Sequence, residues 1–235
     1  MPGISSRPWV LAMVSSSVFT RFLRDWAVVV ILGVLALLGT ARVGEDVFAH
    51  ESTAFDAAVQ RWMLAREVPW LDRVFIVITN AGSVVALCAL AGVGAAYLWY
   101  RRKRRVAATV LLAPVVAVAV FTAVKQAYAR PRPVGLGGIV PSSYSFPSGH
   151  ATAATAVCLT LAYVYWREGF VRRPAALWFA ILVPLLVGIS RVYLNVHWAT
   201  DVLGGWSAGV VIAVLSIVLY DRNRRRERAT PNAAK

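Results

Sequence analysis

The sequence has little charge, and acidic residues are especially scarce. Only 15% of its 235 residues are charged, 25 Lys and Arg stand against 11 Asp and Glu, and 59% of the residues are hydrophobic. Soluble domains carry about 25% charged residues, so this composition excludes an ordinary soluble protein. It also argues against a basic chain that wraps nucleic acid, because the basic residues are grouped between long apolar runs. We therefore expect a membrane protein.

Cysteine is almost absent. Cys88 and Cys158 are the only two, and both lie inside apolar runs. Two such residues cannot form a disulfide framework or a thiolate zinc site, so both of these classes are excluded. We expect both side chains to be small buried core residues.

Six apolar segments have lengths that suit a membrane. A bilayer core about 30 Å thick needs roughly 20 apolar residues in a helix. The segments are approximately Trp26 to Thr40, Val74 to Tyr100, Val106 to Val124, Ala151 to Trp166, Ala175 to Ile189 and Val202 to Tyr220. The sequence thus predicts an all-α polytopic membrane protein with six transmembrane helices in one bundle.

The rest of the chain divides around this bundle. Residues 26–220 are predicted to be one membrane domain, in which the outer loop 42–73 acts as a cap on the mouth of the bundle. Residues 1–25 contain a short apolar run broken by three serines, which favours an interfacial cytoplasmic segment over the alternative of a cleaved signal peptide. Residues 221–235 form a basic tail.

The distribution of Lys and Arg predicts the orientation. If the N-terminus is inside, 17 basic residues lie in inside segments and 8 in outside loops, which places both termini in the cytoplasm. The run Arg101–Arg105 then marks an inside loop, so no nucleic-acid partner is expected. We expect a multi-pass protein of the cell membrane, and the same count turns its polar outer loops toward the periplasm or cell exterior.

Ionisable residues gather in two of those outer loops. Lys125 and Arg132 flank the end of the third segment, and Arg191 begins the loop between the fifth and the sixth. Three cations with a single acid nearby in sequence, Asp201, suit a multiply charged anion such as phosphate. The stretch Pro147-Ser148-Gly149-His150 opens a helix, whose free N–H groups can cradle such an anion. Taken alone, Ser148 would be an ordinary N-cap.

His197 and Asp201 are four residues apart and share one face if a helix begins there. The carboxylate can then hold the Nδ1 proton and leave Nε2 free as a nucleophile. His150 is left to act as the acid that protonates a leaving group. A metal is the alternative for a His/His/Asp set, but three cations would repel it, so we expect no metal and no cofactor.

These residues form three blocks that resemble the signature of the type 2 phosphatidic acid phosphatases (PAP2), also called lipid phosphate phosphatases. The blocks are Lys125-x6-Arg132-Pro133, Pro147-Ser148-Gly149-His150 and Ser190-Arg191-x5-His197-x3-Asp201. No motif position departs from the family pattern. The blocks cover Lys125 to Asp201, and the six segments match the integral-membrane bacterial branch of the family over most of the remaining chain.

The resemblance implies metal-independent, two-step hydrolysis of a lipid phosphomonoester or diphosphate through a phosphohistidine. It implies that His197 is the nucleophile, Asp201 its orienting partner and His150 the leaving-group acid. The residues implied to bind the phosphate are Lys125, Arg132, Ser148, Gly149, Ser190 and Arg191; Ser190 enters only through the resemblance.

The implied partner is a membrane lipid phosphate in the bilayer: polyprenyl diphosphate, phosphatidylglycerol phosphate or phosphatidate. Two alternatives stay open, a lipid phosphotransferase on the same scaffold and a non-catalytic transporter of anionic lipids. The sequence does not decide the oligomeric state.

Overall fold

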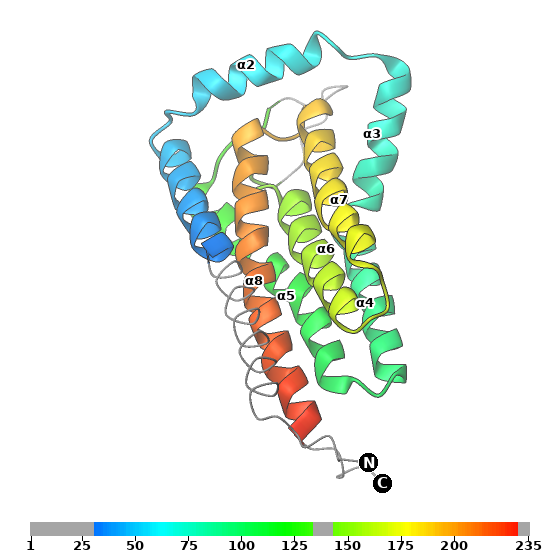
Figure 1. Ribbon diagram of the computed structural model, residues 1–235. Helices are drawn as coiled ribbons and strands as arrows, with labels where there is room; N and C mark the ends of the chain where they lie inside the picture. Colours follow the sequence, from blue (N-terminus) through cyan, green and yellow to red (C-terminus); the bar gives the residue numbers. More distant parts are fainter. Residues whose placement is uncertain (1–30, 134–142, 230–235) are drawn as a thin grey trace, which may run out of the picture.

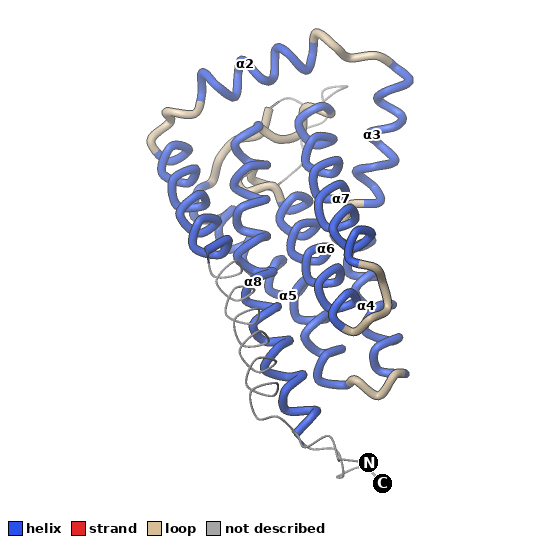
Figure 2. Tube along the Cα trace, in the orientation of Figure 1, coloured by secondary structure: helices blue, strands red, loops and turns tan. Residues whose placement is uncertain are grey.

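The computed structural model describes residues 31–133 and 143–229, and all regular structure in these two ranges is helical (Figure 2). This confirms the all-α expectation for the described residues, whereas the predicted interfacial segment 1–25 lies outside them. Residues 31–48 form the first described helix. It is followed by α2 (Thr53–Leu64), α3 (Pro69–Ala81), α4 (Val84–Tyr100), α5 (Arg104–Tyr128), α6 (Gly149–Arg167), α7 (Arg173–Tyr193) and α8 (Ala199–Ala229).

Helix α6 lies at the centre of the bundle and contacts α4, α5, α7 and α8 (Figure 1). It is buried along most of its length, and many of its buried residues are Ala or Thr. Small side chains let neighbouring helices approach closely. The hydroxyls of Thr152 and Thr155 donate to the carbonyls of Ser148 and Ala151, at 2.9 and 2.8 Å. The hydroxyls are therefore satisfied inside the bundle, so these polar residues do not prevent α6 from running through its centre.

Two glycines of α8 set its closest approach to α6. A Cβ on Gly205 would lie 2.8 Å from the Ser148 oxygen, and one on Gly209 would lie 2.7 Å from the Thr152 oxygen. Both contacts are with backbone atoms, which cannot move aside without shifting the helix. The two glycines therefore serve helix packing. The close approach also keeps the starts of α6 and α8 side by side, where the Ser148 amide donates to the Asp201 carbonyl at 2.9 Å.

The sequence predicts one continuous helix from Val74 to Tyr100, and this prediction is wrong in one respect: the structure has two helices here, with a break between them. Helix α3 already begins at Pro69 and ends at Ala81, and α4 starts at Val84 with a bend of 48° between them. The Ser83 side chain accepts from the Ala86 amide and caps α4. A Cβ on Gly82 would lie 2.3 Å from Val187 Cγ2, so glycine lets the break pack against α7.

Helix α2 crosses one end of the bundle, where α6 and α8 begin (Figure 1); we call this the α2 end. Its Asp56 is buried, and Gln60 Nε2 donates to Asn195 Oδ1 at 2.8 Å. The Val68 amide, just before α3, donates to the Tyr193 hydroxyl at 3.1 Å. Polar contacts therefore attach α2 and the start of α3 to the segment that joins α7 to α8.

The protein is a multi-pass membrane protein. Within the described residues, α5, α7 and α8 are long and apolar enough to cross a bilayer, and the bent pair α3–α4 makes a fourth span if it is counted as one. Helix α6, rich in Ala and Thr and enclosed by its neighbours, is not in this group. Large apolar side chains such as Val85, Val115 and Ile181 are exposed, which suits a surface that faces lipid.

The expectation that both cysteines are core residues is correct for Cys158 only. Cys158 is buried, whereas Cys88 is exposed on α4. On the same face of α4, Val85 is exposed and a Cβ on Gly92 would meet nothing within 4 Å. An apolar run has the same appearance in the sequence whether a residue faces the core or lipid, so the run did not distinguish the two cysteines.

Candidate active site

The predicted site residues come from four helix ends and two loops at the α2 end. Lys125 lies in the last turn of α5, His150 in the first turn of α6, Arg191 in the last turn of α7 and Asp201 in the first turn of α8. Arg132 follows α5 and His197 precedes α8. The helices thus bring together residues that are far apart in the sequence.

His197 is held by Asp201 as its spacing predicts. The Nδ1 and Oδ2 atoms are 3.2 Å apart, and both side chains are almost completely buried. Because a carboxylate only accepts, Nδ1 carries the proton in this pair. Arg132 Nη1 lies 2.9 Å from Nε2, and since a guanidinium only donates, Nε2 presents a lone pair. The neutral tautomer with a free Nε2 is the one that a nucleophile needs.

Asp201 has further partners that the sequence analysis missed. Its Oδ1 accepts from Arg130 Nη1 at 2.6 Å. Its Oδ2 accepts from the Trp198 amide at 2.9 Å and from the Ser145 hydroxyl, which also lies 3.5 Å from His197 Nδ1. The carboxylate is completely buried, and these donors satisfy it there.

Lys125 and Arg132 are both held by backbone carbonyls. The Lys125 ammonium donates to the carbonyls of Tyr144 and Ser145. Arg132 donates from Nε to the Ser143 carbonyl at 2.6 Å and from Nη1 to the Val196 carbonyl at 2.7 Å. These bonds place both cations next to the segment that leads into α6, and Arg132 also lies beside the His197 ring.

Arg191 and His150 complete the ring of charge. Arg191 Nη1 donates to Thr79 Oγ1 at 2.7 Å, and its buried Nε has no hydrogen-bond partner among the described residues. His150 is within electrostatic range of Arg191, His197, Arg132 and Lys125. A buried, unpaired N–H next to a histidine is a donor available to an incoming anion.

The start of α6 has the expected form. Ser148 is the N-cap and accepts from the Ala151 amide at 3.5 Å, and a Cβ on Gly149 would lie 3.2 to 3.3 Å from the Phe121 ring. Ser190 is buried and donates to the Val187 carbonyl at 2.6 Å, along its own helix. This bond accounts for Ser190 structurally, and its role as a phosphate ligand stays a prediction.

Burial controls the protonation of His197. Loss of water lowers the pKa of the imidazole from 6.5 to about 3; Asp201 raises the pKa but does not offset burial, and Arg132 and Arg191 lower it further. The ring is therefore neutral at neutral pH, the form in which Nε2 can attack.

Arg130, Ser145 and Asp56 are the residues that the sequence analysis did not select. Arg130 occupies an unspecified position between Lys125 and Arg132, and Ser145 lies just before the second block. Asp56 was one acid among several in the predicted cap. The sequence offered one signal for Arg130 and Ser145, which is their position beside the predicted blocks, since charged or hydroxyl side chains next to a buried cationic cluster often pair with it.

The described residues contain no group of three or more His, Cys, Asp and Glu that could hold a metal ion. Four cations lie at this site: Arg132 contacts His197, Arg130 contacts Asp201, and Lys125 and Arg191 interact electrostatically with His150. Such a set suits an anion. The prediction that no metal takes part stays a prediction.

Comparisons with known proteins agree with this geometry. The family model of the PAP2 superfamily matches residues 103–225. The chain is 33% identical over 163 residues to phosphatidylglycerophosphatase B of Bacillus subtilis, covering 68% of this chain and 80% of that protein. It is 32% identical over 132 residues to an undecaprenyl-diphosphatase of Sulfolobus acidocaldarius, covering 53% and 60%.

A solved structure is similar over most of its length. The crystal structure of a transmembrane PAP2-type phosphatidylglycerolphosphate phosphatase from Bacillus subtilis superposes with a TM-score of 0.73 at 29% identity, covering 81% of this chain and 96% of that one. The helical arrangement of the bundle is thus shared with a membrane phosphatase. The resemblance based on the three sequence blocks is confirmed.

Acidification should destabilise the folded protein through His197. The ordinary pKa of 6.5 applies to the unfolded chain and the value of about 3 to the folded one, so below pH 6.5 the unfolded chain binds a proton that the folded chain does not. The contribution of His197 to the free energy of unfolding is therefore complete above pH 6.5 and falls as the pH falls toward 3. Thermal unfolding in detergent should show a steeper loss of Tm on acidification for the wild type than for His197→Gln. Equal slopes would contradict the prediction.

Proposed function

This chain belongs to the PAP2 superfamily, and from that premise we propose that it hydrolyses a lipid phosphomonoester or diphosphate at the outer face of the membrane through a phosphohistidine on His197. The observation that carries the proposal is the state of the His197 ring. Its Nδ1 is held by Asp201 at 3.2 Å, and its Nε2 faces Arg132 at 2.9 Å. The nucleophilic atom therefore points at a cation that can hold the phosphoryl group.

In the first step, Nε2 of His197 forms a bond to phosphorus while the bond from phosphorus to the leaving oxygen breaks. His150 donates a proton to that oxygen. Burial and the surrounding cations lower the pKa of the free imidazole to about 3, so His150 takes up this proton when the anionic phosphate binds beside it and offsets those cations. The ring, with Nδ1 still protonated, becomes positively charged, and Asp201 stabilises it. In the second step His150 takes a proton from water, the hydroxide oxygen bonds to phosphorus, and the P–N bond breaks to release inorganic phosphate.

The phosphoryl oxygens are held throughout by fixed donors. Lys125, Arg132 and Arg191 supply positive charge, Gly149 supplies the first amide of α6, and the N-cap Ser148 supplies its hydroxyl. Ser190 joins this set by the family pattern. Phosphoryl transfer needs mainly positioning and charge stabilisation, so a preorganised ring of cations is a sufficient catalyst. The cations take the place that a metal ion has in other phosphatases.

The substrate proposed is a lipid. Exposed apolar side chains surround the bundle, and the site lies at one end of it, where a lipid headgroup can reach the cations while its chains stay in the bilayer. The relatives act, by their names, on phosphatidylglycerophosphate and on undecaprenyl diphosphate. Polyprenyl diphosphate, phosphatidylglycerol phosphate and phosphatidate are the candidates for this chain.

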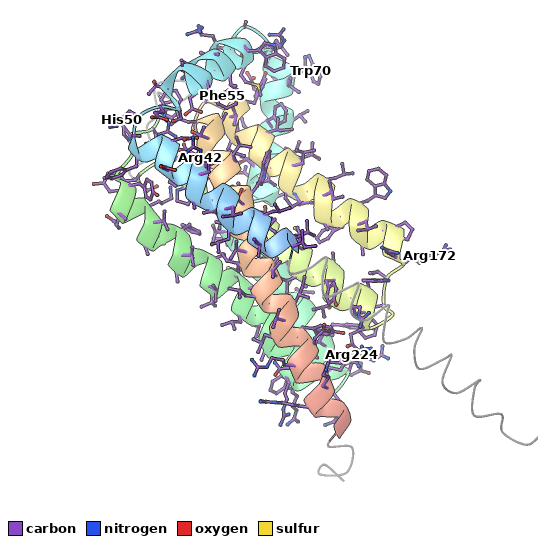
Figure 3. The ribbon with its side chains drawn as sticks, turned by 60° about the vertical axis from the view of Figure 1, so that its left-hand side comes forward. Arg42, His50, Phe55, Trp70, Arg172 and Arg224 are labelled. Carbon is purple, nitrogen blue, oxygen red and sulfur yellow. The ribbon has the colours of Figure 1, made fainter. Side chains whose placement is uncertain are left out.

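We propose six spans with both termini in the cytoplasm, and α2 with its flanking residues 42–73 as an outer cap. Figure 3 places Arg172 and Arg224 at the end of the bundle away from His50 and Phe55. The run Arg101–Arg105 covers the turn after α4 and the first residues of α5, and Lys103 bonds to Glu168 after α6, so this basic run belongs to the same end. Basic residues favour the cytoplasmic side, which puts the α2 end at the periplasm or exterior.

The nucleophile can be tested by removing its side chain. His197→Ala should lower phosphate release from a short-chain lipid phosphate to the background rate, because the variant lacks the proposed nucleophilic nitrogen. EDTA should leave the wild-type rate unchanged. His50→Ala is the matched control and should retain the wild-type rate. Turnover by folded His197→Ala would falsify the assignment, and lipid movement without phosphate release by the wild type would favour the transporter.

The acid can be tested through the leaving group. His150→Ala should slow hydrolysis of a lipid phosphomonoester by about 10² to 10⁴-fold, because the alkoxide then leaves without a proton. Hydrolysis of p-nitrophenyl phosphate should be affected much less, because nitrophenolate leaves readily without protonation. Leaving-group release in the first turnover gives the comparison, because the second step, in which His150 is the base, is the same for both substrates. Equal losses with both substrates would mean that His150 only positions the phosphate.

A further inference from the structure

We propose that Asp56 on α2 is a positioning residue of the active site, which holds Arg130 against Asp201 and supplies a negative charge that supports the positive ring formed on His197. This inference rests on the proposed function, because it takes His197 to be the nucleophile. It gives the helix that crosses the α2 end a direct part in the chemistry.

The contacts form a continuous line of charge from α2 to His197. Arg130 Nη2 donates to Asp56 Oδ2 at 2.6 Å, and Arg130 Nη1 donates to Asp201 Oδ1 at 2.6 Å. The side chains of Asp56, Arg130 and Asp201 are 2%, 12% and 0% exposed. Water screens these charges weakly, so a change at one end of the line is felt at the other.

Asp56 is fixed by more than its ion pair. Its Oδ1 accepts from the Thr200 amide at 2.9 Å, and its Oδ2 accepts from the Thr200 hydroxyl at 2.6 Å. Thr200 lies in the first turn of α8, directly before Asp201, and its hydroxyl also accepts from Arg130 Nη1 at 2.9 Å. A carboxylate at a helix N-terminus is favourably placed. Asp56 thus sets the position of the helix turn that carries Asp201.

The net charge of Asp56, Arg130 and Asp201 leads to an expected effect on kcat that packing alone would not produce. Arg130 neutralises one of the two carboxylates, so the group of Asp56, Arg130 and Asp201 carries one net negative charge. That charge stabilises the positive ring when Nε2 bonds to phosphorus. It also slightly repels the phosphate before the reaction. Removing the charge of Asp56 should therefore lower kcat and leave KM unchanged or lower.

Asp56→Asn tests this, because the amide keeps the shape of the side chain and loses its charge. Phosphate release should show a kcat lower by about 10-fold, which corresponds to about 1.4 kcal/mol, with no rise in KM. The kcat of Asp56→Ala should fall by about the same factor. If Asp56 only attached α2 to the bundle, Asp56→Asn would have a higher kcat than Asp56→Ala. The defect of the alanine variant would then appear in KM and in the melting temperature.

The double variant Asp56→Asn/Arg130→Gln separates charge from structure. Its group again carries one net negative charge, and the glutamine amide that replaces the guanidinium can still donate a hydrogen bond to Asp201. The melting temperature of the double variant checks that it folds. We expect its kcat to lie closer to the wild type than that of Asp56→Asn. A double variant as slow as Asp56→Asn, or slower, would overturn the proposal.

Gln60→Ala is the control on the same helix. It removes an uncharged contact of α2 with Asn195 and should keep the wild-type kcat. His197→Ala, measured in parallel, distinguishes a failure of the proposed function from a failure of the role proposed for Asp56. If His197→Ala still turns over, the proposed function fails; if it is inactive and Asp56→Asn has the wild-type kcat, only the role of Asp56 fails.

Discussion

The structure depends on one buried carboxylate. Asp201 is completely buried, and such a group is stable only where donors and cations surround it. Those donors come from three places: Arg130 after α5, Ser145 before α6, and His197 and the Trp198 amide before α8. Forming this cluster therefore fixes the relative positions of three helices. The same contacts that make the burial of Asp201 possible orient the His197 ring, so the stability of this end of the bundle and its chemistry have a common origin.

The apolar bundle makes this arrangement possible by close packing. Helix α6 carries Ala and Thr, and α8 carries Gly205 and Gly209 where it meets α6, so the two helices start side by side. The N-terminal amides of α6 then face the turn that carries Asp201. Arg191 at the end of α7 keeps a buried N–H free of partners among the described residues. An anion that binds here meets donors that are already in place, so little reorganisation is needed during the reaction.

Much of the site could be predicted from the sequence, because local rules govern it. The i,i+4 spacing of His197 and Asp201 fixes their contact as soon as a helix starts nearby, and the cap at Ser148 follows from residue type. Arg130 and Asp56 could not be found in this way, since their contacts join residues 71 and 74 positions apart. The break at Gly82 was also missed, because apolar residues continue on both sides of it. It depends on Val187, which is distant in sequence and fills the space beside the glycine.

The central claim is that the phosphoryl group passes through Nε2 of His197. The most direct test is to mix the protein with a lipid substrate labelled in its terminal phosphate, stop the reaction in base within the first turnovers, and locate the label by mass spectrometry. The account predicts a base-stable, acid-labile phosphate on His197, absent from His197→Ala. Label on another residue, or rapid phosphate release without any labelled protein at early times, would contradict it.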